Sequence, residues 1–400
     1  MAREDQKDVT LPTDYNIKAG PVLLNFTGSV EADYVDNIGL QNSGGMSDFL
    51  LTPEVGIEAN WPVTQVNSLT LATSVGYTKY LEHPQFDTSH INVSPDSALS
   101  FNIYTGDFKI NIHDAFSYQQ DPTDEAALSD IVNFDRFENI AGVSVLWDLN
   151  KVILNLAYDH INFMATGLQE YTGASLPDPG ALDFTADQVS ASAELHVSST
   201  FISGIEATVS RREYDDYAGN YDQFTAGPYF KVQVTDHIKA ELSGGYEYID
   251  SPPNSFNPLY AQGILGPSYG AGPDSSFYAN LTIDHQLNKY FLERLALGHE
   301  IELGLLAETA DVYYINYSAS WHVNSHLNLA LNVGYQDVDE LGGLITASSF
   351  DLFTAGAQAN FPVTKSLSGA LIYEFNNKSA DLADQSYAQN RVGLLLTYHF

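Results

Sequence analysis

The chain has 400 residues, a formal net charge of −35 and no cysteine, and 44% of its residues are apolar, with 25 Tyr and 21 Phe. Nucleic acid is excluded as a partner, because phosphate binding needs a basic surface. No run of about 18 apolar residues occurs, so the sequence has no transmembrane helix. The aromatic content and the alternation described below exclude disorder, which so large a net charge would otherwise suggest.

The first segment, residues 1–20, is polar at its start. Met1 to Asp5 has no apolar stretch of the kind found in a signal peptide. We expect the folded unit to begin after this segment, at residue 21.

From residue 21 to the end, apolar and polar side chains alternate in one stretch after another. Successive side chains of a β-strand point to opposite faces, so each stretch predicts a strand with one apolar and one polar side. The first runs from Val22 to Tyr34, and others cover 55–61, 152–159 and 327–336. The last has an entirely apolar face made of Val392, Leu394, Leu396, Tyr398 and Phe400.

About eighteen such stretches occur, at roughly 22 residues for each strand with its connection, which suits the ~9–11 residues that a tilted strand needs to cross a bilayer. Their connections alternate in length. Short ones are expected at 62–67, 105–107, 148–151, 197–200, 235–237, 324–326 and 362–366, with a longer turn at 287–295. Long ones are expected at 38–48, 82–95, 121–135, 166–183, 215–222, 251–274, 337–348 and 376–386, whereas the connection near 307–311 is short where a long one is due. This alternation is typical of periplasmic turns and extracellular loops, and an even strand count puts both termini in the periplasm.

Four short segments at strand ends repeat one another: 61–64, 147–150, 321–324 and 361–364. Each begins with an aromatic residue just before a tight turn, and all three tryptophans of the chain hold this position. Amphipathic rings are favoured at a membrane–water interface, so the repeats predict an aromatic girdle. The predicted girdle residues are Trp61, Trp147, Trp321, Phe361, Tyr398 and Phe400.

These patterns predict an all-β fold: a closed antiparallel transmembrane barrel of about 18 strands (16–18) in residues 21–400, with the last strand paired to the first. Residues 1–20 are expected to be a periplasmic segment. The expected location is the bacterial outer membrane, with the signal peptide already removed. A soluble β-sandwich also alternates, but it needs no aromatic band beside every second turn. A β-propeller repeats at about 40 residues, but its blades lack such long strands.

Two motifs resemble a known family. Tyr34-Val35-Asp36-Asn37, followed by Ser47-Asp48-Phe49 and Pro53, resembles the β-barrel porin family of Gram-negative bacteria, which includes barrels encoded with exopolysaccharide-export machinery. Tyr398-His399-Phe400 resembles the terminal motif that the barrel-assembly machinery recognises. The resemblance implies an outer-membrane pore or export conduit, with that machinery as a partner through Phe400.

If the girdle faces lipid, the polar faces of the strands point into the lumen. Charge on the lipid face would cost several kcal/mol at mid-membrane, which fixes this orientation. Acids outnumber bases on the inward face, and an acid-lined pore attracts cations; the alternative is that the acids only solvate a wide lumen and pair with the few bases. The residues expected to line the lumen and set selectivity are Glu31, Asp33, Glu54, Glu58, Asp159, Glu194, Glu206, Glu241, Glu300, Glu302, Glu374, Lys109, Lys231 and Arg391.

The sequence contains no enzyme signature. The histidines stand singly along the chain, and no Gly-x-Ser-x-Gly or His-Glu-x-x-His motif occurs. We expect no catalysis and no cofactor. One loop, 214–222, mixes carboxylates with rings, and Asp215, Asp216 and Asp222 are weak candidates for Ca²⁺ ligands, although a solvated loop tip is the simpler interpretation. The longest loop, 251–274, is expected either to narrow the lumen or to cap its mouth.

The sequence therefore favours a porin-like outer-membrane channel for passive passage of small solutes, with an acidic, polar, cation-preferring lumen. An exopolysaccharide-export conduit, or a closed barrel acting as a surface adhesin or scaffold, are the alternatives. The expected partners are the lipid bilayer, lipopolysaccharide and the barrel-assembly machinery, and a homo-oligomer is left open.

Overall fold

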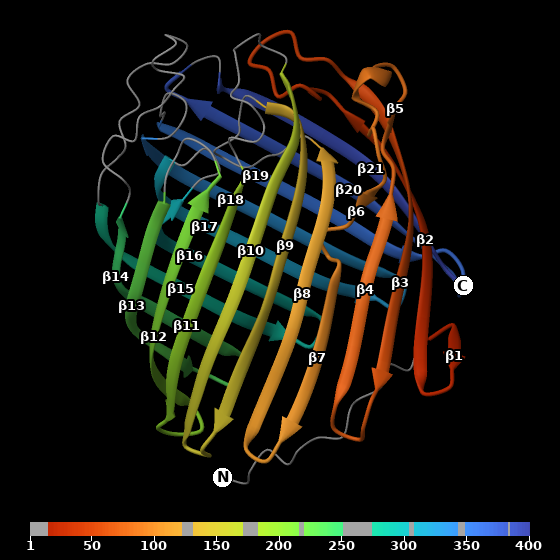
Figure 1. Cartoon of the computed structure of the whole chain (residues 1–400). Helices are drawn as coiled ribbons and strands as arrows, with labels where there is room; N and C mark the ends of the chain where they lie inside the picture. Colours follow the sequence, from red (N-terminus) through yellow and green to blue (C-terminus); the bar gives the residue numbers. More distant parts are fainter. Residues whose placement is uncertain are drawn as a thin grey trace.

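The computed structural model describes residues 15–121, 131–170, 183–215, 220–250, 274–303, 308–342, 349–382 and 385–400. Within these ranges the chain is almost entirely strand, joined by tight turns at one end and longer connections at the other (Figure 1). The strands of the first half are β1 Ile17–Ala19, β2 Val22–Val35, β3 Asp48–Pro62, β4 Ser68–Gly76, β5 Lys79–Tyr80, β6 Asn92–Val93, β7 Ala98–Thr105, β8 Phe108–Asp121, β9 Ile131–Asp148, β10 Val152–Glu170 and β11 Phe184–His196, with the short 3-10 helix η1 Pro84–Phe86. Those of the second half are β12 Phe201–Tyr214, β13 Asn220–Gln233, β14 Ile238–Asp250, β15 Asp274–Asn288, β16 Phe291–Leu303, β17 Glu308–Asn324, β18 Leu327–Gly342, β19 Ser349–Pro362, β20 Leu367–Ala380 and β21 Tyr387–His399.

The sheet closes on itself. Neighbouring strands pair antiparallel along the chain, and β21 pairs with β2 from Thr27↔His399 to Val35↔Arg391, so the last strand lies beside the first (Figure 1). Two short strands continue longer ones. β5 pairs with β3 beyond the end of β4, and β6 pairs with β4 and β8 beyond the start of β7. Over the described residues, with β5 and β6 counted as continuations of β4 and β7 and the short β1 left out, the barrel has 18 strands. The predicted closed antiparallel barrel, its strand number and its first-to-last pairing are confirmed.

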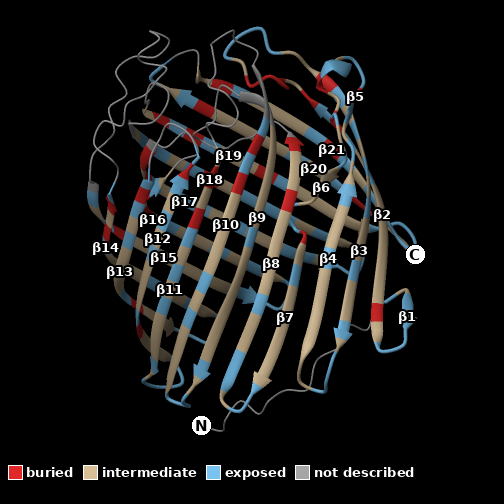
Figure 2. Ribbon diagram, in the orientation of Figure 1, coloured by how far each residue is buried: buried red, intermediate tan, exposed pale blue. Residues whose placement is uncertain are grey.

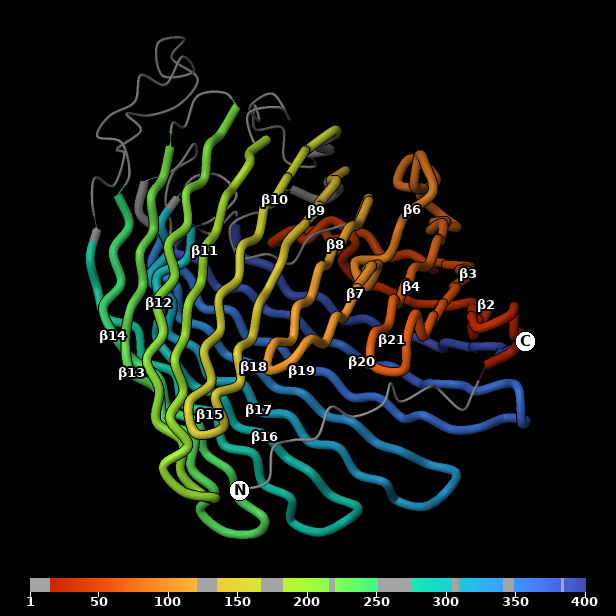
Figure 3. Tube along the Cα trace, turned by 60° about the horizontal axis from the view of Figure 1, so that its bottom comes forward, coloured from red at the N-terminus to blue at the C-terminus, as the bar shows by residue number. Residues whose placement is uncertain are grey.

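Tight turns join the strands at one end of the barrel, called here the turn end (Figure 3). Side-chain hydrogen bonds to the backbone stabilise several of them. The hydroxyls of Thr64, Thr235 and Thr364 each accept the amide N–H groups two and three residues further on. Such bonds compete with the strand ladder and favour a turn. The repeated Val-Thr pairs of the sequence therefore mark real turns.

One predicted turn is wrong. The longer turn expected at 287–295 is a tight one, since β15 ends at Asn288, β16 begins at Phe291, and the Asn288 side chain accepts the amides of Tyr290 and Phe291 at 2.8 and 3.1 Å. The charged residues that made this stretch resemble a loop are paired between β15 and β16. Arg294 donates to Asp284 at 2.6 Å, so this stretch stays extended although its sequence is polar.

The two faces of each strand differ as the alternation predicts. On β3, Phe49, Val55 and Trp61 share one face and are 52%, 58% and 42% exposed, whereas Glu54 and Glu58 occupy the other face. An exposed apolar face on so many strands is the outer surface of a membrane barrel, because lipid and not water covers it. No helix among the described residues is long and apolar enough to span a membrane.

Most of the buried side chains gather toward the opposite end, called here the loop end (Figure 2). One cluster contains Val35, Ile38, Tyr80 and Phe86 beside β2 and β3. A second, on β17 to β19, contains Ala310, Val312, Val338, Phe350 and Leu352. By strand alternation the strand residues of both clusters lie on the inner face, so apolar side chains cover part of the inner wall near the loop end, and that wall is not polar throughout.

Part of the expected N-terminal segment joins the sheet. β1 pairs with β2 from Ile17↔Leu24 to Ala19↔Val22, on the stretch of β2 just beyond the end of β21. Asn16 connects β2 to the C-terminal residue that follows β21, since its side chain accepts the amide of Phe26 and donates to the carbonyl of Phe400. The segment therefore extends the closing seam at the turn end.

Candidate functional site

The residues predicted to form the girdle lie on the outer face at the turn end. Trp61, Trp147 and Trp321 are 42%, 38% and 47% exposed, and Phe361 lies over Gly369 of the next strand. The ring of Trp147 stacks on Phe108 at 5.4 Å. Further aromatic residues of this row, which the repeat did not reveal because they begin strands instead of ending them, are Phe108, Phe201 and Phe291, with Phe230 packed at 6.1 Å from Phe201.

A second aromatic row, not predicted from the sequence, lies on the outer face toward the loop end. Its tyrosines donate hydrogen bonds to polar residues placed above them: Tyr158 to Asp187 at 2.7 Å, and Tyr335 to Asp351 at 2.5 Å. Rings with one apolar and one polar end suit the two interfaces of a bilayer. The two rows therefore bracket the apolar belt of the barrel.

The residues predicted to line the lumen all lie on the strand faces opposite the exposed apolar side chains. Glu54 and Glu58 oppose Val55, for example, and Glu206 opposes Ile205, which is 65% exposed. The same alternation places the other members of the set on the inner face of their strands: Glu31, Asp33, Asp159, Glu194, Glu241, Glu300, Glu302, Glu374, Lys109, Lys231 and Arg391.

Arg391 of β21 stands at the centre of an acidic group at the seam. Its guanidinium contacts Glu31 at 2.9 Å, Asp33 at 3.1 Å and Glu374 at 3.3 Å. Asp33 is almost fully buried, with 1% of its side chain exposed. Three carboxylates meet one guanidinium, so this group stays net negative and also ties β20, β21 and β2 together.

Lys231 of β13 is surrounded in the same way. Its ammonium lies 2.5 Å from Glu194 and 3.9 Å from Glu241, and 5.1 Å from the centroid of the Tyr229 ring. The hydroxyl of Tyr278 donates to Glu206 at 3.1 Å. The phenols were not predicted as lumen residues, because Tyr occurs on both faces of the strands: Tyr158 points outward, whereas Tyr278 points inward.

Neither a family model nor a curated protein matches the sequence. A BenF-like porin from Pseudomonas fluorescens Pf-5 superposes with a TM-score of 0.50 at 10% identity, over 95% of this chain and 99% of the other. OccK2 (OpdF) of Pseudomonas aeruginosa does so with a TM-score of 0.50 at 10% identity, over 94% and 98%. The fold is that of the outer-membrane porins. At this identity the likeness is one of fold, and the site residues are not carried across.

In this porin fold several histidines act as hydrogen-bond partners of carboxylates, although they stand singly in the sequence. His113 lies on the inner wall 2.8 Å from Asp159. His160 lies on the outer face 2.8 Å from Asp187. Their partners come from neighbouring strands or from the next strand but one, which sequence spacing does not reveal.

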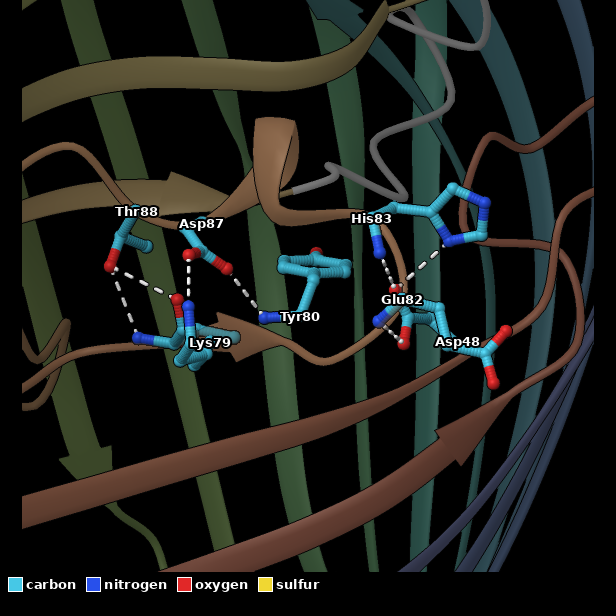
Figure 4. A network of polar contacts seen from close by, with 8 residues as sticks. Asp48, Lys79, Tyr80, Glu82, His83, Asp87 and Thr88 are labelled. Atoms are coloured by element: carbon cyan, nitrogen blue, oxygen red, sulfur yellow. Dashed lines mark hydrogen bonds and ion pairs between the residues drawn. The ribbon is translucent and has the colours of Figure 1, made fainter.

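A polar network fixes the connection between β4 and β7 against the barrel (Figure 4). The buried carboxylate of Asp48 accepts the amides of Glu82 and His83 at 2.9 and 2.8 Å and contacts the His83 ring at 3.0 Å. Asp87 accepts the amide of Tyr80 at 2.8 Å and the ammonium of Lys79 at 2.6 Å. β5 therefore lies beside β3 in the sheet, where Tyr80 pairs with Leu50, and the network holds the following connection to β3.

The motif that carries the family resemblance has a structural role at the seam. Asp36 accepts the backbone and side-chain amides of Asn390, both at 2.7 Å. Asn37 donates to the carbonyls of Gln41 and Ala388 at 2.8 and 3.0 Å. These residues join the first connection to the last strand.

The loop candidates are only partly within the described residues. Asp216 and nearly all of the 251–274 loop lie outside them, so neither the calcium hypothesis nor the lumen-plug hypothesis is tested there. Asp215 donates its amide to the carbonyl of Asp183, and Asp222 lies 4.0 Å from Arg211. Among the described residues, no group of three or more His, Asp or Glu side chains is arranged to hold a metal ion.

Proposed function

We propose that this chain is a passive outer-membrane channel whose inner wall favours cations over anions. The porin fold supports a channel, and the charge arrangement of the inner wall supports the preference. The observation that carries the proposal is the group around Arg391, where one base is met by three carboxylates.

Ion pairs with the few bases do not neutralise the carboxylates of the inner wall. Lys231 repeats the pattern with Glu194 and Glu241, and Glu54 and Glu58 share their face of β3 with no base. Fixed charge of one sign in a confined aqueous passage concentrates ions of the opposite sign. Small cations are therefore expected to enter more readily than anions.

The solute bound by a structural neighbour is not expected to be the solute of this chain. One structure of OccK2 (OpdF) is a complex with glucuronate, and it superposes with a TM-score of 0.50 at 10% identity. Glucuronate is an anion. An acidic inner wall disfavours anions, so this chain is expected to select a different class of solute.

The test is reversal-potential measurement on the purified protein in planar bilayers under a salt gradient. At low salt the potential should have the sign of cation preference, and the preference should fade as screening shortens to about 3 Å at 1 M. Anion preference at low salt would refute the proposal. Insertion without conductance under any condition would instead favour the closed scaffold.

The lipid and assembly partners belong to the same proposal. Phe400 is 67% exposed at the outer face, and its amide donates to the carbonyl of Phe26 at 3.3 Å. An exposed terminal ring at the seam is available to the assembly machinery until the first and last strands pair. Deleting Phe400 is expected to lower the yield of assembled barrel in cells while leaving refolding in detergent nearly unchanged.

A further inference from the structure

The end of β16 separates from its neighbour β15. The two strands pair from Asn288↔Phe291 to Ala279↔His299, yet both continue beyond this point within the described residues. β16 remains paired with β17 as far as Leu303↔Thr309. The loop end of this hairpin therefore turns away from the wall formed by β15.

Two side chains of the inner wall hold the separated end. Glu247 of β14 accepts the amide of Ile301 at 3.0 Å, and Arg212 of β12 donates to the carbonyl of Leu303 at 3.0 Å. Along the wall, β12 and β16 are four strand spacings apart, or about 19 Å at ~4.8 Å each. An arginine side chain does not span that distance along the wall. The end of β16 must therefore cross the interior of the barrel.

The crossing segment is packed and not a solvated flap. Ile301 is 3% exposed, Glu247 is 3% exposed, and Ile249 of the wall is fully buried. Gln223 donates to the second carboxylate oxygen of Glu247 at 2.9 Å, so Glu247 is held from both sides. The guanidinium of Arg212 lies 4.3 Å from the centroid of the Phe184 ring. Arg212 and Glu247 are thus each held by a further partner on the wall.

Aromatic side chains lie on the outer face where the strands part. The ring of His299 lies 4.6 Å from that of Phe277 and 4.2 Å from that of Tyr313, and its Nε2 atom lies 2.6 Å from Asp311. Phe277 and Tyr313 are exposed on the outer face, whereas His299 is buried between them. This stack fills the wall beside the separation.

We propose that residues 300–303 form the selectivity segment of the channel, positioned by Arg212 and Glu247. The proposal rests on the channel function given above. Because Ile301 is buried against the wall, Glu302 lies on the other face of the segment, and it is exposed. Coulomb interaction falls with distance, so a carboxylate carried into the passage acts on a passing ion more strongly than one on the wall.

The placement is tested by crosslinking in the full chain, which has no cysteine of its own. Ser210→Cys with Leu303→Cys leaves Arg212 and the accepting carbonyl in place. A short bismaleimide should join this pair. The matched control, Ile202→Cys with Ala296→Cys, connects the same two strands nearer the turn end, where β16 lies in the wall, and should not be joined. Failure of the first pair, or equal crosslinking of both, would overturn the proposal.

Conductance tests the role. The double variant Arg212→Ala/Glu247→Ala should raise single-channel conductance about twofold and admit larger solutes, because the passage widens. Glu302→Gln should lower cation preference at low salt with little change in conductance at 1 M, and Glu58→Gln on the wall should do so less. Unheated gel mobility confirms that the variants fold. If the wild type conducts with cation preference and these variants match it, the selectivity segment is refuted while the channel function stands. If the wild type does not conduct, the channel function fails, and with it the segment's assigned role.

Discussion

Removing Arg391 should weaken the closure between the first and last strands. In Arg391→Met the carboxylate of Asp33, with only 1% of its side chain exposed, loses its cation. Breaking a buried ion pair by removing one partner costs about 3–5 kcal/mol, and the low end applies here because 35% of the Arg391 side chain is exposed. We therefore expect a loss of about 3 kcal/mol in the free energy of unfolding.

The assay is urea unfolding of the barrel in lipid vesicles, followed by tryptophan fluorescence. Asp33→Asn/Arg391→Met should recover most of the loss, because the most deeply buried carboxylate is then no longer charged. Glu374→Gln serves as the control, since that carboxylate contacts the same guanidinium but is 46% exposed, and it should cost about 0.5 kcal/mol. The reasoning is refuted if Arg391→Met unfolds like the wild type, or if the double variant is no more stable than the single one.

Three further predictions follow from other parts of the barrel. Trp147 should be quenched by lipids brominated near the headgroup more than by lipids brominated at the chain end, and the reverse order would contradict the girdle assignment. Asp48→Ala removes the acceptor of several amides, so limited proteolysis should cut the 77–97 connection sooner while the barrel stays resistant; unchanged cleavage would show that the network does not hold it. Glu54→Gln/Glu58→Gln should lower cation preference at low salt, whereas Asp215→Asn should change it less, and equal effects would count against selection by the wall.

Strand alternation predicted the faces well because one physical rule governs every strand. Lipid outside and water inside give each strand the same period of two, so Trp61 and Glu58 were placed on opposite faces without knowledge of their neighbours. The longer turn expected at 287–295 shows where this rule fails. Asp284 and Arg294 neutralise each other across two strands. Because this ion pair forms only on folding, the charged residues by themselves resemble a loop in the sequence.

The sequence by itself determined the strand number range and the closure of the barrel, because these depend on local alternation. Only the tertiary structure decided which carboxylates contact which base. Arg391 and Glu31 are 360 positions apart and contact each other only because the barrel closes. It also decided that the end of β16 crosses the interior to reach Arg212. Such contacts depend on the distance between strands that are not neighbours, and no period within a single strand encodes that distance.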